Sequence, residues 1–185
     1  MSESAGDVMP PGCKLIEVRV RDLRQLYNEI DPSPFHDRDL ATDAEQFIVE
    51  TARELPRGSP VGLVVHLDRP GIDTRAAADL REAVHRHFLR EADSARRRLR
   101  VLFRRGRLSL AIGLAFLAMT GILANRVSDV PHGGLAGFLH NSLIIGGWVA
   151  MWRPLEVFLY EWWPILAEAR LSDRLASMPI RIDSA

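Results

Sequence analysis

An arginine-rich segment runs directly into an uncharged apolar stretch, and this junction limits the folds that the chain can adopt. Residues 96–107 contain seven arginines and no acidic residue, and residues 108–124 contain no charged residue. A helix of about 20 apolar residues is long enough to cross the roughly 30 Å hydrocarbon core of a bilayer. The junction therefore predicts a basic juxtamembrane helix over 96–107, followed by a first membrane-spanning helix over 108–126.

A second uncharged stretch covers residues 133–152 and ends in an aromatic segment, WRPLEVFLYEWWPI. It predicts a second spanning helix over 135–153, joined to the first by an external link over 127–134. Trp and Tyr rings prefer the headgroup level of a membrane, so residues 154–177 are predicted to form an interfacial and then cytosolic helix. The alternative for both apolar stretches is a buried helix of a soluble protein.

Charge is distributed unevenly along the chain, although the total is zero. Residues 1–95 have 12 basic and 18 acidic residues and a net charge of −6, residues 96–107 carry +7, and the remainder carries −1. Arginines and lysines accumulate on the cytosolic side of membrane helices. The arginine-rich segment therefore predicts that both termini face the cytosol.

Four of these arginines share one face of a continuous helix, at i, i+3, i+7 and i+10. They are candidates for contacts with anionic lipid headgroups: Arg97, Arg100, Arg104 and Arg107. The alternative is that they only determine topology and select no lipid. Another face carries an apolar seam for helix packing: Phe88, Ala92, Ala95, Leu99 and Leu102. The acidic domain before the arginines and the absence of a groove-reading motif argue against nucleic acid as a partner.

Within the second apolar stretch, small and polar residues suggest contacts inside the membrane. Ser142, Gly146 and Ala150 form a small-residue stripe that permits close approach of another helix. His140 and Asn141 are strongly polar and form a candidate intramembrane site on a proton or ion path. The alternative is that this pair touches water at the outer end of the helix.

Residues 14–95 predict a small cytosolic α/β domain with the order β-α-β-α and a right-handed parallel crossover. Strands are expected at 14–21 and 61–67. The first long helix is expected from a capping box of Thr42 and Glu45, with Phe47, Ile48 and Ala52 packing inward. The second helix is expected to start at a cap on Asp73 or Thr74. Residues 1–13 are expected to be a disordered lead.

The C-terminal residues 178–182, MPIRI, alternate in the manner of a strand. Residues 178–185 are therefore expected to pair with the 16–20 strand or to add to the same sheet, alone or with help from a second protomer. The predicted fold class is a membrane α-helical hairpin with two spanning helices plus a small cytosolic α/β domain.

Motifs that carry chemistry are not found in the sequence. The acidic stretch around Asp37 fails the spacing of a calcium loop, and Glu82 with His85 lacks the second copy that a di-iron site needs. Cys13 is the single cysteine, which excludes an intramolecular disulfide. The sequence thus predicts no catalytic residue, no metal site and no cofactor, and leaves enzymatic activity an open but disfavoured possibility.

Two segments carry a resemblance to a family: DLRQLYNEIDPSPFHDRDLATDAEQFI and WRPLEVFLYEWWPILAEARLSDRLASMPIRI. They resemble a family of small, uncharacterised bacterial inner-membrane proteins with two predicted transmembrane helices. The resemblance implies the bacterial inner membrane as the location and supports the topology above. It implies no activity, ligand or catalytic residue.

These patterns favour a non-catalytic adaptor or accessory subunit that acts through protein and lipid contacts. The expected partners are anionic lipids and either further copies of the chain or another membrane protein. One alternative is a homo-oligomeric channel or transporter component. A further alternative is a membrane-bound sensor or enzyme with its ligand site in the acidic 31–45 loop.

Overall fold

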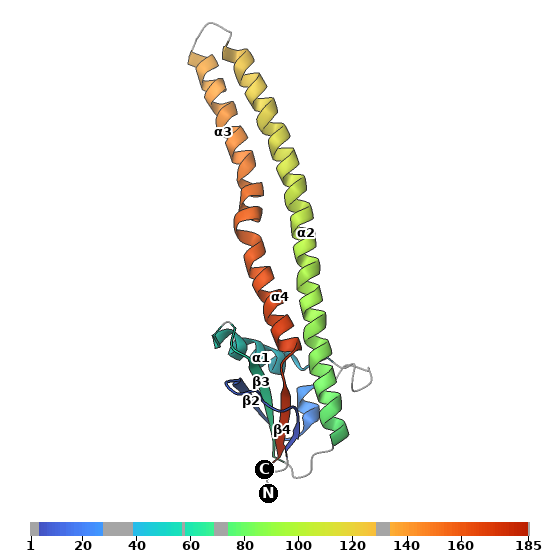
Figure 1. Cartoon of the computed structure of the whole chain (residues 1–185). Coiled ribbons are helices and arrows are strands. Elements are labelled where there is room, and N and C mark those ends of the chain that lie inside the picture. Colours follow the sequence, from blue (N-terminus) through green and yellow to red (C-terminus); the bar gives the residue numbers. More distant parts are fainter. Residues whose placement is uncertain (1–3, 28–38, 57, 69–73, 129–133, 185) are drawn as a thin grey trace. The chain divides into compact units, whose positions relative to one another are not determined.

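The computed structural model describes residues 4–27, 39–56, 58–68, 74–128 and 134–184 (Figure 1). The chain divides into two compact units. The sheet unit comprises Met1–Ser94 with Glu168–Ala185, and the hairpin unit comprises Ala95–Ala167. The described chain is mostly helical, with a small four-stranded mixed sheet and two long apolar helical stretches.

The sheet has the strand order β1-β4-β3-β2. Strand β3 (Val61–Leu67) pairs in parallel with β2 (Lys14–Val20) on one side and with β4 (Ile180–Ser184) on the other. All residues of β3 except His66 are buried, whereas β2 alternates between exposed and covered residues. A continuous apolar run is typical of a central strand and an alternating run of an edge strand.

The prediction that the C-terminal residues join the sheet is confirmed, and their partner is β3. Leu63 lies opposite Ile180, and Val65 lies opposite Ile182. The alternative pairing with residues 16–20 is wrong, because β3 has an apolar partner on each side and so separates β2 from β4.

The expectation of a disordered lead over 1–13 is wrong for the part of the lead that the structure describes. Strand β1 (Ser4–Gly6) pairs antiparallel with β4. The Asp7 N–H donates to the Ile180 carbonyl at 2.9 Å, and the Ile180 N–H donates to Asp7 Oδ2 at 3.2 Å. Arg81 donates to Asp7 Oδ1 at 2.9 Å. This segment is held by backbone hydrogen bonds and by the Asp7 carboxylate, and not by apolar side chains. The sequence therefore shows no hydrophobic pattern at this strand.

Three helical segments pack on the sheet and form one hydrophobic core: α1 (Thr42–Glu54), the first turns of α2 (Thr74–Ser128) and the end of α4 (Trp162–Ala176). A short 3-10 helix, η1 (Leu23–Leu26), follows β2. Chain segments far apart in the sequence therefore build this core together. The predicted cap at Asp73 and most of the predicted 127–134 link lie outside the described residues.

Helix α1 begins differently from its prediction. Ala41 occupies the N-cap position without a side-chain capping bond, so the Thr42 capping box is wrong. Ile48 and Ala52 are buried as expected, but Phe47 is 48% exposed. Successive residues of a helix project about 100° apart, so the face defined by Ile48 and Ala52 turns Phe47 toward solvent.

Helix α2 continues without interruption from Thr74 to Ser128, as its periodicity predicts. Phe88, Ala92 and Ala95 of the predicted seam are each at most 1% exposed. Small and aromatic residues at alternating spacings of four and three residues thus form a buried stripe on this helix.

In the hairpin unit, α2 lies antiparallel to a second helical segment made of α3 (Gly134–Glu156), the π-helical turn η2 (Val157–Glu161) and the start of α4 (Figure 1). A methyl group on Gly106 would lie 2.8 Å from Val157, and one on Gly113 would lie 3.1 Å from Met151. Gly106, Gly113 and the buried Thr120 are spaced seven residues apart. This spacing keeps small residues on the contact face of two helices that coil around each other.

Candidate functional site

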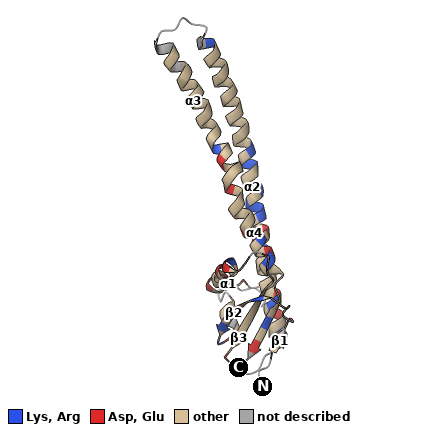
Figure 2. Ribbon diagram, turned by 60° about the vertical axis from the view of Figure 1, so that its left-hand side comes forward, with Lys and Arg blue, Asp and Glu red and all other residues tan. Residues whose placement is uncertain are grey.

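The first candidate site is the band of arginines on α2 (Figure 2). The predicted headgroup residues Arg97, Arg100, Arg104 and Arg107 are all exposed. Among the residues that the structure describes, no acidic side chain pairs with these four arginines or with Arg105. The band therefore presents positive charge that the described residues do not neutralise.

Aromatic residues of the second helical segment lie at the same level of the hairpin unit as the arginines. The Phe103 ring lies 6.2 Å from the Phe158 ring and 6.4 Å from the Trp162 ring, measured between centroids. Tyr160 and Trp163 of this level are 71% and 62% exposed. Arginine and exposed aromatic rings thus surround one end of the hairpin unit from both helical segments, which is the composition of a membrane interface.

A charged cluster accompanies these aromatic residues. Arg153 contacts Glu156 at 2.9 Å and Glu161 at 2.8 Å. Glu156 is the last residue of α3, and Glu161 is the last residue of the π-helical turn that follows it. The cluster brings partly neutralised charge to the end of the apolar stretch, where side chains can reach toward water.

Beyond this level, the hairpin unit exposes large apolar side chains. The helical segments Arg75–Arg126 and His140–Ala176 each contain a window that is long and apolar enough to cross a membrane, and only 17% of each window is buried. Examples with exposed fractions of 62% to 71% are Leu108 and Ile112 on α2, and Phe138, Ile145, Trp148 and Val149 on α3. A core helix of a soluble protein would bury such residues.

The predicted small-residue stripe contacts α2 only in part, since the Ala150 carbonyl oxygen lies 3.3 Å from a methyl group built on Gly113. Ser142 is exposed, and no atom lies within 4 Å of a methyl group built on Gly146. Gly147 occupies the contact instead, because a methyl group there would lie 2.8 Å from both Leu117 Cδ1 and Thr120 Oγ1. Close approach of another helix along Ser142, Gly146 and Ala150 stays a prediction.

The predicted polar pair is divided between two environments. His140 Nδ1 lies 3.1 Å from the carbonyl oxygen of Ala124, so the ring bonds across the two helices. Asn141 is exposed. Because the two side chains differ in direction, the structure does not bring them together as one site.

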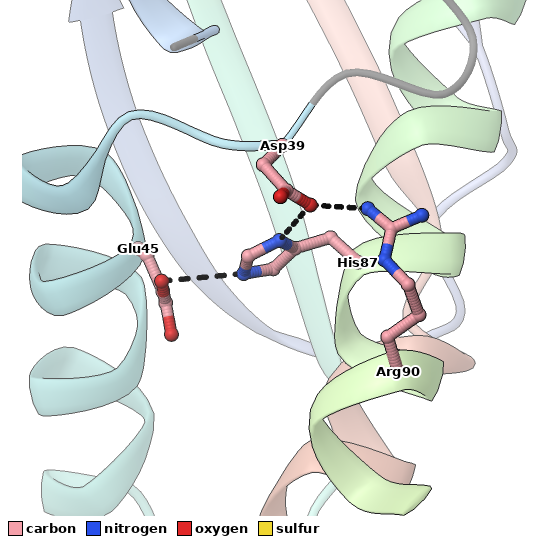
Figure 3. A network of polar contacts seen from close by, with 4 residues as sticks. All are labelled: Asp39, Glu45, His87 and Arg90. Carbon is pink, nitrogen blue, oxygen red and sulfur yellow. Dashed lines mark hydrogen bonds and ion pairs between the residues drawn. The ribbon is translucent and has the colours of Figure 1, made fainter. Parts of the chain in front are cut away.

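The second candidate site is a network around His87 in the sheet unit (Figure 3). The His87 side chain is 7% exposed, and its Nδ1 lies 3.4 Å from Asp39 Oδ1. Its Nε2 lies 3.3 Å from Glu45 Oε2, close enough for an ion pair but without a hydrogen bond. Arg90 also donates to Asp39 Oδ1.

This network places one carboxylate beside each ring nitrogen of His87. The network joins Asp39 in the segment before α1, Glu45 of α1 and two residues of α2. The sequence gives no signal for it, because Asp39 and His87 are 48 positions apart.

A pocket of about 280 Å³ adjoins Glu45 in the sheet unit. Its lining includes four carboxylates and one guanidinium: Glu45, Glu50, Glu91, Glu168 and Arg53. The lining also includes Phe88, Leu171 and Ser172. The acidic lining is suited to cationic or hydrogen-bond-donating groups.

Neither site has the geometry of a metal centre. Within the described ranges, no group of three His, Cys, Asp or Glu residues is placed to hold a metal ion. At His87, each ring nitrogen already faces a carboxylate at 3.3 to 3.4 Å. Imidazole nitrogens bind a metal ion through a free lone pair, and both nitrogens here face a carboxylate.

Comparison of the chain with protein-family models, with curated proteins and with solved structures finds no match.

Proposed function

We propose that this chain is a membrane-anchored adaptor or accessory subunit of the bacterial inner membrane. In this proposal α2 and α3 cross the bilayer as a hairpin, both termini lie in the cytosol, and the hairpin tethers the sheet unit near the membrane. The observation that carries the proposal is the exposure of large apolar side chains on a hairpin that ends in arginine and aromatic residues.

The lengths of the apolar segments support this proposal. Residues 108–126 and 135–153 each comprise 19 residues, and a helix of 19 residues is about 28 Å long. The hydrocarbon core of a bilayer is roughly 30 Å thick. In the hairpin unit the contact of Ala124 with His140 and that of Gly106 with Phe158 place the two segments side by side over this whole length.

The adaptor role is supported by helix surface that the hairpin itself leaves uncovered. Exposed Ser142 and the open position at Gly146 lie on α3 away from the α2 contact. Small residues allow backbones of membrane helices to approach closely. The partner in this proposal is therefore a second copy of the chain or a helix of another membrane protein.

Native mass spectrometry of the full chain, extracted from its membrane into lipid nanodiscs, tests the proposal. We expect the chain to resist extraction with alkaline carbonate and to carry a stoichiometric partner protein or a second copy. Gly146→Leu should reduce this association, whereas Gly121→Leu on α2, another position without an atom within 4 Å, should leave it unchanged.

Two outcomes would contradict the proposal. Release of the chain by alkaline carbonate would exclude a membrane-spanning hairpin. A closed ring of several copies that conducts ions in liposomes would instead support the channel, and loss of conductance in Asn141→Ala would identify the pore.

A further inference from the structure

We infer that Arg104 and Arg105 form the headgroup site for an anionic phospholipid, on the face of α2 that points away from α3. The inference rests on the proposed membrane insertion and adds a specific ligand class to it. A hollow of about 650 Å³ lies on this face, lined by Val101, Arg104, Arg105, Arg107 and Leu108. All of these residues belong to the hairpin unit.

Helical geometry explains how the hollow is built. Val101, Arg104, Arg105 and Leu108 follow the spacing i, i+3, i+4 and i+7, which places them on one face. Val101 and Leu108 form its apolar floor and are 49% and 64% exposed. With about 100° between successive residues, Arg104 and Arg105 project to opposite sides of this floor.

The opposite face of the same turns is occupied. Gly106 contacts Val157 and Phe158 closely, so α3 and η2 lie on the far side of α2 from the hollow. The hollow therefore opens toward the surroundings of the hairpin. Ile112, which is 62% exposed, follows Leu108 on the same face and continues the apolar floor into the apolar stretch.

The combination of charge and apolar floor indicates the chemistry of the ligand. Arg104 and Arg105 have no acidic partner among the described residues, and guanidinium groups bind phosphate oxygens with high geometric complementarity. A phosphate alone would leave Val101 and Leu108 uncovered. A phospholipid satisfies both features, because its phosphodiester can lie between the two guanidiniums while an acyl chain covers Leu108 and Ile112.

Position along the helix separates this site from the general positive charge of the band. Arg97 and Arg100 are also exposed and without an acidic partner among the described residues. Their midpoint precedes that of Arg104 and Arg105 by six residues, or about 9 Å along the axis. This distance exceeds the Debye length of about 8 Å at physiological ionic strength. Removing either pair deletes the same charge, but only one pair borders the hollow.

The test measures binding of phosphatidylglycerol to the detergent-solubilised full chain by native mass spectrometry, with phosphatidylcholine as the zwitterionic comparison. A basic side chain at the membrane surface contributes about 1 kcal/mol to binding of anionic lipid. We therefore expect Arg104→Gln with Arg105→Gln to weaken phosphatidylglycerol binding about 30-fold. The matched pair Arg97→Gln with Arg100→Gln should weaken it only about twofold, because neither side chain lines the hollow and the midpoint of the pair lies about one screening length away.

Three results would overturn the inference. Equal losses in the two charge-matched pairs would show general electrostatic attraction without a site. Equal binding of phosphatidylcholine would remove the requirement for an anionic headgroup. Competition by the deacylated headgroup, glycerophosphoglycerol, at the same concentration as the lipid would show a phosphate site without an acyl component.

Membrane insertion is measured in a separate experiment, so that failure of the proposed function can be distinguished from failure of the lipid site. If the wild-type chain is released by alkaline carbonate, the proposed function is wrong, whereas the lipid measurement in detergent still reports on the hollow. If the chain is retained in the membrane and the two arginine pairs behave alike, only the lipid site is wrong. Retention of the Arg104→Gln, Arg105→Gln chain in the carbonate-washed membrane shows that its lower lipid binding does not come from failed insertion.

Discussion

The close contact at Gly147 makes a strong prediction about the hairpin unit. All four tryptophans of the chain lie between residues 148 and 163, so tryptophan fluorescence reports on this unit alone. A methyl group on Gly147 would lie 2.8 Å from Leu117 Cδ1 and from Thr120 Oγ1, whereas ordinary carbon contacts lie at about 3.5 to 4.0 Å. The neighbouring Gly146 has no atom within 4 Å of such a methyl group.

The contact cannot relax by moving Thr120 alone. The Thr120 hydroxyl donates to the Leu117 carbonyl at 3.0 Å, and Thr120 is only 3% exposed. Gly147→Ala must therefore separate the helices or break this bond, and overpacking of this kind costs about 1 to 3 kcal/mol. Replacing glycine by alanine also favours a helix by about 1 kcal/mol, but this gain is the same at Gly146.

The comparison of Gly147→Ala with Gly146→Ala isolates the cost of the contact. We expect Gly147→Ala to be less stable by about 1 to 3 kcal/mol, measured by titrating the detergent-solubilised chain with dodecyl sulfate and following tryptophan fluorescence. If Gly147→Ala were as stable as Gly146→Ala, the described contact between α2 and α3 would be wrong.

Three further predictions concern the sheet unit. Gly6 has a φ of +121°, and a methyl group there would clash with the Ile180 carbonyl oxygen. Gly6→Ala should therefore lower the free energy of unfolding by at least about 1 to 2 kcal/mol and speed hydrogen exchange of the β4 amides. Unchanged exchange would contradict the β1 pairing. His87→Leu removes the link between Asp39 and Glu45 and should lower the free energy of unfolding by about 1 to 3 kcal/mol. The loss should appear as faster amide hydrogen exchange in α1. Unchanged exchange in α1 would show that the link contributes nothing to stability. Burial raises the pKa of the Cys13 thiol above its ordinary value, although the positive charge of Arg174 opposes the rise. Iodoacetamide should therefore modify Cys13 more slowly in the folded chain than in urea at pH 8, and stability should fall as the pH rises through the raised pKa; equal rates in both states would contradict this burial.

Much of the sheet unit can be predicted from the sequence because its strands have distinct hydrophobic patterns. The buried run Val61–Leu67 is the central strand, and the alternating Lys14–Val20 is an edge strand. The short β1 cannot be predicted in this way, because Ser4–Gly6 bonds through its backbone and through the following Asp7. The His87 network is also absent from any local pattern, since it joins residues from separate parts of the chain.

The contact face of α3 could not be predicted from the sequence either. Its residues are apolar on all sides, so periodicity does not identify whether Gly146 or Gly147 faces α2. A signal does exist on the partner helix, where Gly106, Gly113 and Thr120 recur every seven residues. Reading this spacing together with the apolar run would have identified the inner face of the hairpin.

The proposed topology has the hairpin crossing a membrane with its arginine-rich end in the cytosol. Cysteine labelling with a membrane-impermeant maleimide tests it directly in a Cys13→Ser background, since Cys13 is the single cysteine. One reporter is Ala78→Cys, at an exposed position of the sheet unit, and the other is Ser128→Cys, at the last residue of α2. We expect labelling of Ser128→Cys in intact spheroplasts and of Ala78→Cys only in inverted vesicles. Labelling of both reporters from the same side would contradict it.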